Sequence, residues 1–308
     1  MTIPSPRFTL VSFHAHPDDE ALLTAGTLAR AVRDGHRVVV VVATTGEAGL
    51  SAGSPEGLAA TRTAELEASV AAIGAHRVEV LGFADSGFSV DDADGSKFPP
   101  DPDAQRFSDV HVELAAHRLA AILVEEGADA LTGYDPAGGY GHRDHVQVHR
   151  VAARAAALAG TPLLLEATID RRLLLPVHRV LRAIARLVAL PALPDLSRAY
   201  TAHADLTHRV DVRGHLDAKL ASMAAHVSQA SADEGVRTLA LLLRLPRPVA
   251  RRVLGTEWFR EVGRPGGAPL LDDIFASLRC PDPDGQRTAA ASRPRRSGPS
   301  TGPVRPRG

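Results

Sequence analysis

Residues 38–43 read Val-Val-Val-Val-Val-Ala, an unbroken apolar run in which nearly every side chain is β-branched. β-Branched side chains favour extended backbone, and a run without polar alternation is typical of a strand that is covered on both faces. Strands of this kind occur in parallel sheets with helices on either side. The run therefore predicts an α/β fold.

Strand-like and helix-like segments alternate through the first 170 residues. We expect strands at 8–13, 38–43, 78–81, 130–134 and 163–168, and helices at 21–33, 61–73, 109–126 and up to about 159. This order predicts βαβ units and a Rossmann-like, mostly parallel sheet flanked by helices. In the common doubly wound order the first and fourth strands are neighbours, and ligands bind at their carboxyl ends.

The C-terminal half predicts helical additions to this core. Residues 174–190 predict a basic amphipathic helix that packs on the domain, with a lid or a membrane-surface contact as alternatives. Residues 215–229 predict a second amphipathic helix, and 280–308, rich in Pro, Gly, Ser and Arg, predict a disordered tail. We expect a catalytic core at 1–170 and a substrate or lid portion of the same domain at 171–279.

Composition excludes several classes of protein. The formal net charge is −1, so we expect no nucleic-acid partner. The single cysteine, Cys280, excludes an internal disulfide. The sequence predicts neither a secretory signal nor a spanning membrane segment. These features favour a cytoplasmic protein, and they leave a homo-oligomer open.

A first polar cluster, His16-Pro17-Asp18-Asp19-Glu20, follows the first predicted strand. Dinucleotide-binding proteins have a GxGxxG pattern at this place, and its absence disfavours such a cofactor. A turn brings His16 and Asp19 to one side, where an imidazole and a carboxylate suit Zn²⁺ or Fe²⁺, while Asp18 points elsewhere. The alternative, an aspartate N-cap for the next helix, needs only one carboxylate.

A second polar cluster, YDPAGGYGHRDH at 134–145, follows the fourth predicted strand. Its three glycines allow a ligand to approach the backbone closely. His142 and His145 are three residues apart at the start of a helix. The two clusters should meet at the switch point of the sheet and bind one divalent cation. Spacing alone leaves open which of the two histidines is the ligand.

Four motifs occur in one order over about residues 8–160: AHPDDE, TRTAELEASVAAIG, FADSGF and YDPAGGYGHRDH. In these motifs the chain resembles the PIG-L or LmbE-like family of metal-dependent N-acetylglucosaminyl deacetylases. The first and last motifs are highly specific. The resemblance implies an LmbE-like fold and hydrolysis of a linear, non-peptide amide bond that releases acetate from an amino-sugar substrate.

The resemblance also implies a role for each residue at the metal. His16, Asp19 and His145 would bind Zn²⁺, with Fe²⁺ as the alternative. Asp18 would be the general base that takes a proton from the attacking water. A bound metal ion makes that water more acidic, so its proton is more easily removed.

Further roles follow from the same resemblance. His142 would donate to the oxyanion or protonate the leaving amine, and Asp144 would hold His142 and favour its imidazolium form. Tyr140 would close over the substrate carbonyl. Arg62 and Asp85 would contact sugar hydroxyls or a polar aglycone.

The exact substrate is left open, because the segment ALLTAG at 21–26 is apolar where some relatives have polar groups. Candidates are an N-acetylglucosaminyl-inositol, a glycolipid, a glycosylated antibiotic and the amide of a thiol-sugar conjugate. Two other classes of protein are alternatives. One is a non-catalytic sugar- or metal-binding domain, which would be expected to lack Asp18 or one of the metal ligands. The other is a membrane-surface protein. The segment KLASMAAHVSQ is similar to a C-terminal signature of some relatives, and its Lys219, His226 and Gln229 would face either the cleft or solvent.

Overall fold

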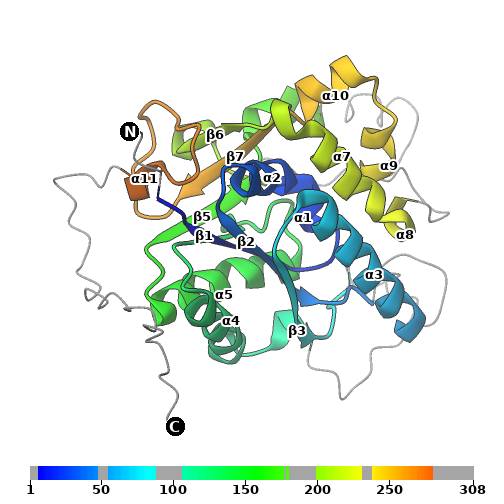
Figure 1. Cartoon of the computed structure of the whole chain (residues 1–308), viewed down its shortest axis with the longest axis vertical. Helices are drawn as coiled ribbons and strands as arrows, with labels where there is room; N and C mark the ends of the chain where they lie inside the picture. Colours follow the sequence, from blue (N-terminus) through cyan, green and yellow to red (C-terminus); the bar gives the residue numbers. More distant parts are fainter. Residues whose placement is uncertain are drawn as a thin grey trace, which may run out of the picture.

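A seven-stranded sheet forms the centre of the computed structural model, which describes residues 6–47, 55–87, 106–176, 178–179, 199–230 and 238–279 (Figure 1). The strand order is β3-β2-β1-β4-β5-β7-β6. The strands are β1 (Thr9–His14), β2 (Arg37–Thr44), β3 (Arg77–Phe83), β4 (Ala130–Tyr134), β5 (Leu163–Thr168), β6 (His208–Asp211) and β7 (Thr256–Glu261). Strands β1 to β5 pair in parallel, and β6 and β7 pair antiparallel. The mostly parallel α/β sheet predicted from the sequence is confirmed.

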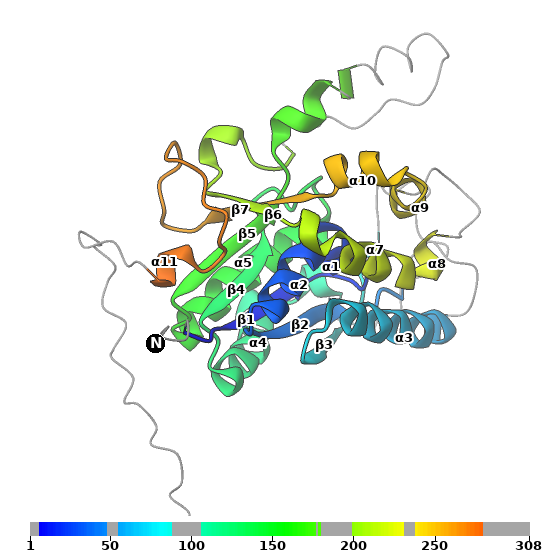
Figure 2. The ribbon, with the colours of Figure 1, turned by 45° about the horizontal axis from the view of Figure 1, so that its top comes forward.

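Helices cover both faces of this sheet (Figure 2). On one face lie α4 (Val112–Glu126) and α5 (Arg143–Ala159), which pack against each other and against β3, β4 and β5. On the other lie α1 (Asp19–Leu23), α2 (Ala25–Arg33), α3 (Pro55–Ile73) and α7 (Leu216–Ala225). The shorter helices are α8 (Val227–Ala230), α9 (Thr238–Leu243), α10 (Arg247–Val253) and α11 (Ala276–Arg279).

The valine run forms the buried part of β2, as predicted. Every residue from Val38 to Ala43 is fully buried, between β1 on one side and β3 on the other. The helices on the two faces remove both sets of side chains from water, which explains why the run has no polar alternation.

The predicted neighbours β1 and β4 are adjacent, and Ser12 lies opposite Thr132 in the pair. Both strands run in the same direction, so they end at the same edge of the sheet. The two polar clusters leave the sheet at this edge. The β1/β4 pair therefore positions the candidate site.

The predicted single helix at 21–33 is wrong, because the structure has two helices with a break at Thr24. The Thr24 hydroxyl donates to the carbonyl oxygen of Glu20 at 3.1 Å. The carboxylate of Glu257, from β7, accepts from the backbone N–H groups of Gly26 and Thr27 at 2.9 and 2.7 Å. A distant side chain thus caps the second helix, which local sequence could not indicate.

The sequence analysis assigned no strand near the C-terminus, whereas β6 and β7 complete the sheet. Alternate residues of β7 are buried, and two of these, Glu257 and Glu261, are charged. Buried charges conceal the apolar alternation by which a half-buried strand is recognised. Residues 171–279 thus contribute to the central sheet itself.

Other predictions for the C-terminal half have mixed outcomes. The helix expected at 215–229 is interrupted at His226, between α7 and α8. Residues 174–176 and 178–179 are helical, and the rest of 174–190 lies outside the described residues, as do Cys280 and the predicted tail at 280–308. None of the helices in the described part of the chain has the length and apolar character needed to cross a membrane.

We predict that Gly133→Ala destabilises the fold. A Cβ atom at Gly133 in β4 would lie 2.8 Å from the Cβ of Ala152 in α5. Overpacking of this kind typically costs about 1–3 kcal/mol of unfolding free energy, which urea denaturation measures. Gly214→Ala is the control, because a Cβ there has no neighbour within 4 Å. Equal unfolding free energies for the two variants would contradict the close packing of α5 on β4.

Candidate active site

The loop after β1 has an unusual backbone. Asp18 has φ 109° and ψ −27°, and among the described residues only Asp18 and Tyr200 have positive φ without being glycine. A non-glycine residue in a disfavoured backbone region costs about 1–3 kcal/mol, and it persists only where its surroundings hold it. The backbone N–H of Asp18 donates to Glu20 Oε2 at 3.0 Å, and that of His16 donates to Asp19 Oδ2 at 3.0 Å. The loop is thereby fixed by its own carboxylates.

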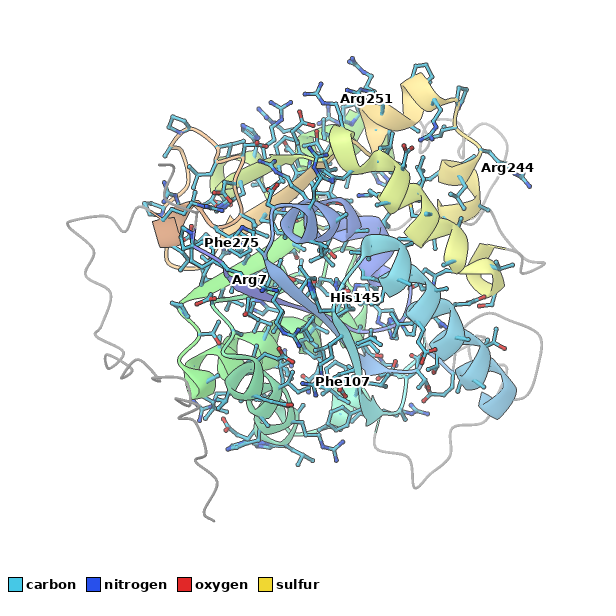
Figure 3. The ribbon with its side chains drawn as sticks, in the orientation of Figure 1. Arg7, Phe107, His145, Arg244, Arg251 and Phe275 are labelled. Carbon is cyan, nitrogen blue, oxygen red and sulfur yellow. The ribbon has the colours of Figure 1, made fainter. Side chains whose placement is uncertain are left out.

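His16, Asp19 and His145 converge on one point. One ligand atom from each lies within 4.8 Å of the others, with Asp19 Oδ2 3.4 Å from His16 Nδ1 and Asp19 Oδ1 3.3 Å from His145 Nε2. Figure 3 shows His145 near the middle of the molecule, whereas Arg244 and Arg251 lie at the periphery of the molecule in this view. The structure thus brings together the three residues that the sequence predicted as metal ligands.

The chemistry of this group fits a divalent metal ion. His145 Nε2 is buried and has no hydrogen-bond partner among the described residues. Asp19 Oδ1 lies 3.3 Å away, so an ion bound between the two atoms would satisfy both. Two imidazoles and one carboxylate are donors that suit zinc or ferrous iron.

A second group, His16, His142 and Asp144, also has ligand atoms within 4.8 Å of one another. Here the other ring nitrogen of His16, Nε2, lies 3.1 Å from Asp144 Oδ2 and 3.3 Å from Asp85 Oδ1. A histidine that binds metal commonly donates its second ring N–H to a carboxylate, which fixes the tautomer and the ring orientation. We therefore interpret Asp144 and Asp85 as partners of His16 rather than as a second metal site.

Asp144 contacts His142 through its backbone. The backbone N–H of Asp144 donates to His142 Nδ1 at 3.2 Å, and His142 is the N-cap of α5. The carboxylate of Asp144 accepts from the Ser86 hydroxyl at 2.5 Å and from the Ser86 backbone N–H at 3.0 Å. Ser86 belongs to the FADSGF motif, which was the only sequence signal for this contact.

The surroundings of His142 favour its neutral ring over imidazolium. Burial lowers its pKa to about 4, and His16 and His145 lower it further than Asp144 raises it. The charge of Asp144 does act toward the imidazolium form that the sequence predicts. Burial and the neighbouring rings outweigh it.

Asp18 lies beside the candidate ligands His16, Asp19 and His145. It faces Arg62, with 3.4 Å between Asp18 Oδ2 and Arg62 Nη2. Burial raises the pKa of Asp18 to about 6, and the charge of Arg62 partly opposes that shift. Arg62 also donates to the carbonyl oxygens of Gly46 at 2.7 Å and Pro17 at 2.5 Å. Its guanidinium group thus joins two loops, and its predicted contact with a sugar stays a prediction.

The side chain of Asp85 is 5% exposed, lies next to His16 and accepts from the backbone N–H of Gly87 at 2.9 Å. Its own backbone N–H donates to Glu47 Oε1 at 2.7 Å. These contacts hold the loop after β3 against the candidate metal ligands. A sugar contact by Asp85 also stays a prediction.

Two tyrosines flank the site. Tyr140, 47% exposed, has its ring centroid 5.2 Å from that of His145, in an edge-on arrangement. Tyr200, which the sequence analysis did not single out, donates its backbone N–H to Gly139 O at 2.8 Å. Burial, with the charges of Asp135 and Asp19, raises the pKa of Tyr200 to about 12. The C-terminal portion therefore reaches the second loop directly, although no motif marks the residue.

His14 lies behind the site rather than in it. Its Nδ1 is 2.9 Å from the Tyr134 hydroxyl, and its Nε2 is 2.7 Å from the Ser12 hydroxyl. The Tyr134 ring packs next to His145, with 4.7 Å between the ring centroids. These hydrogen-bonded side chains are buried and contact the proposed ligand His145 through Tyr134.

Comparisons with known proteins show which family has this fold and these motifs. A family profile described as PIG-L, GlcNAc-PI de-N-acetylase, matches residues 11–156. Relatives match over a longer range, and the chain belongs to this family.

One relative is the 1D-myo-inositol 2-acetamido-2-deoxy-alpha-D-glucopyranoside deacetylase of Nocardioides sp., 33% identical over 304 residues, with 87% of this chain and 98% of the relative covered. The enzyme of the same name from Mycobacterium sp. is 35% identical over 259 residues, with 79% and 80% covered. Among solved structures, N,N′-diacetylchitobiose deacetylase from Pyrococcus horikoshii shares the fold, with a TM-score of 0.54, 19% identity, and 87% of this chain and 85% of that chain covered.

We predict that the protein binds about one Zn²⁺ per chain and that His145→Ala weakens binding more than about 100-fold. Even the partners of metal ligands change affinity by about 10- to 100-fold when they are lost. Competition with a chelating dye measures the affinity. His149→Ala is the matched control, because His149 is one turn further along α5 and faces Glu166 at 3.2 Å instead. Equal affinities for the two variants would exclude His145 as a ligand.

Proposed function

We propose that the chain is a metal-dependent hydrolase that removes the acetyl group from an N-acetylglucosamine linked to inositol or to a similar polar group. The observation that supports this most directly is the group of His16, Asp19 and His145 beside the constrained Asp18. The names of the relatives support the amino-sugar substrate. A glycolipid substrate, a cytoplasmic location and a homo-oligomer stay predictions from the sequence.

His16, Asp19 and His145 would hold zinc, with ferrous iron as the alternative. Three protein ligands are the usual number at a catalytic zinc site. When bound, such an ion lowers the pKa of its water and polarises the carbonyl group of the acetamide. Asp144 and Asp85 would keep the His16 ring in the orientation that this binding needs.

Asp18 would act as the general base. Its carboxylate belongs to neither group of candidate ligands, and its pKa of about 6 suits proton transfer near neutral pH. It accepts the proton of the attacking water as the water oxygen bonds to the carbonyl carbon. When the C–N bond breaks, Asp18 returns this proton to the nitrogen, which gives a free amine and acetic acid, and the acid then ionises to acetate in solution.

His142 would donate a hydrogen bond to the carbonyl oxygen as that oxygen becomes negative. Its Nδ1 accepts from the backbone N–H of Asp144, so the neutral ring has its proton on Nε2. Its place at the N-terminus of α5 also disfavours a positive charge on the ring. Of the two roles that the sequence left open, this geometry favours the oxyanion donor over the acid.

The first test is release of amine from N-acetylglucosaminyl-inositol, with N-acetylglucosamine, N,N′-diacetylchitobiose and the amide of a thiol-sugar conjugate as comparisons. We expect the inositol conjugate to be the best substrate and the activity to vanish with a chelator and return with Zn²⁺ or Fe²⁺. A preference for the thiol-conjugate amide would contradict the proposed substrate. Activity that survives complete removal of metal would contradict the proposed mechanism.

We predict that Asp18→Asn lowers kcat by about 10²- to 10⁴-fold, the usual contribution of a general base, while KM and zinc affinity change little. Amine release gives kcat and KM, and dye competition gives the affinity. Asp34→Asn is the control, because Asp34 is half-exposed at the end of α2. Full activity of Asp18→Asn would refute the assignment of the base.

We predict that His142→Asn lowers kcat by about 10²- to 10³-fold without loss of stability. Asparagine is a good N-cap and can still accept from the Asp144 N–H, but it has no donor at the position of Nε2. His111→Asn is a matched control, because His111 caps α4 in the same way, by accepting from the Glu113 N–H. Equal kcat values for the two variants would show that His142 only caps its helix.

A further inference from the structure

Glu20 is a buried carboxylate that the proposed mechanism does not use. It is the last residue of the first polar cluster and is fully buried. Its Oε2 accepts from the backbone N–H of Asp18 at 3.0 Å. Its Oε1 accepts from the Ser69 hydroxyl at 2.6 Å and lies 2.6 Å from His226 Nε2. One carboxylate thus joins the loop of Asp18 to α3 and to the end of α7.

His226 reaches Glu20 because the helix is interrupted there. It has φ −84° and ψ 61°, which is not helical, and its ring is fully buried. Two residues further on, the backbone N–H and the hydroxyl of Ser228 both donate to Glu65 of α3, each at 2.7 Å. One turn before His226, the hydroxyl of Ser222 is 2.7 Å from that of Ser69. The chain on both sides of His226 is therefore anchored to α3.

The helix α3 presents one side to these contacts. Arg62, Glu65 and Ser69 have the spacing of residues on one helical face. Arg62 holds the carbonyl of Pro17, and Ser69 holds Glu20 two turns later. The loop around Asp18 is thus bound to α3 through Arg62 and Ser69. It is bound to His226 through Glu20.

We infer that His226 is a positioning residue for the proposed reaction and acts through Glu20 on the backbone of Asp18. The inference rests on the proposed role of Asp18 as the base. A buried carboxylate keeps a single orientation when donors satisfy both of its oxygens, and it reorients when one donor is lost. Without the His226 N–H, Oε1 of Glu20 keeps the Ser69 hydroxyl alone of these two donors, so the carboxylate is oriented less firmly and the bond from Oε2 that holds the left-handed backbone at Asp18 weakens.

The KLASMAAHVSQ segment thereby has an assignment that the sequence left open. Lys219 and His226 are both buried, and each pairs with a carboxylate rather than with solvent. Lys219 pairs with Glu257 at 2.6 Å, and through it with α2, whereas His226 pairs with Glu20. The side chain of Gln229 lies outside the described residues.

The test compares His226→Leu with His226→Gln and with Lys219→Met, using the full-length protein. Glutamine presents an N–H close to the place of Nε2, so it should restore what leucine removes. Lys219→Met removes a buried ion pair from the same helix without touching Glu20, so it controls for lost stability. Hydrogen–deuterium exchange of the peptide covering residues 15–23 reports on the loop without any need for activity, and kcat, KM and zinc affinity are measured in parallel.

We expect His226→Leu to speed exchange in residues 15–23 and to lower kcat by about 10- to 100-fold, the range for a misplaced or unsupported catalytic group, with KM within about twofold. His226→Gln should restore most of the slow exchange in residues 15–23 and most of kcat. Lys219→Met should speed exchange near residues 25–28, where Glu257 caps α2, and leave 15–23 unchanged.

Unchanged exchange in residues 15–23 of His226→Leu, or equal losses of kcat in His226→Leu and Lys219→Met, would overturn the inference. Should His226→Leu fail to fold, Ser69→Ala removes a different donor from the same carboxylate by deleting one hydroxyl, and the same comparison applies. If the wild-type protein with Zn²⁺ releases no amine from any substrate of the panel, the proposed function fails. The exchange data then still decide whether His226 holds the loop.

Discussion

The parallel pairing of β1 with β4 is the constraint on which the rest of the site depends. Neighbouring parallel strands end at the same edge of a sheet, so the residues that follow them meet however far apart they are in the chain. His16 and Asp19 leave one strand end and His145 leaves the other, and their ligand atoms come within 4.8 Å. The same edge also holds the N-terminus of α5, so His142 enters the site as a helix cap.

The site places many ionisable groups where little water reaches them, and each buried carboxylate has its own partners. Asp144 is bound by Ser86 and contacts His16, while Glu20 is bound by Ser69 and contacts His226. Charges without such partners would be costly in the interior. The differing partners would separate the tasks in the proposed mechanism: one carboxylate contacts a proposed metal ligand, one contacts the loop, and Asp18, whose pKa is raised, is the proposed base.

The C-terminal portion contributes two strands, β6 and β7, to the central sheet. Strand β7 extends the central sheet, and its Glu257 caps α2 and pairs with Lys219. His226 contacts the first loop through Glu20, and Tyr200 contacts the second loop at Gly139. In this family member the residues that follow the matched profile therefore help to shape both loops of the site. Whether they also act as a lid stays a prediction.

The sequence by itself determined the parallel sheet and the convergence of the two polar clusters, because both follow from local signals. The β-branched run of β2 and the order of strands and helices are visible without any partner. Tertiary structure decided whatever depends on a contact between distant residues. Glu257 caps α2 within the helix expected at 21–33, buried glutamates conceal β7, Ser86 donates to the carboxylate of Asp144, and His226 meets Glu20. The position of a strand is encoded in the periodicity of its own side chains, but the partner of a buried charge is known only once the chain has folded around it.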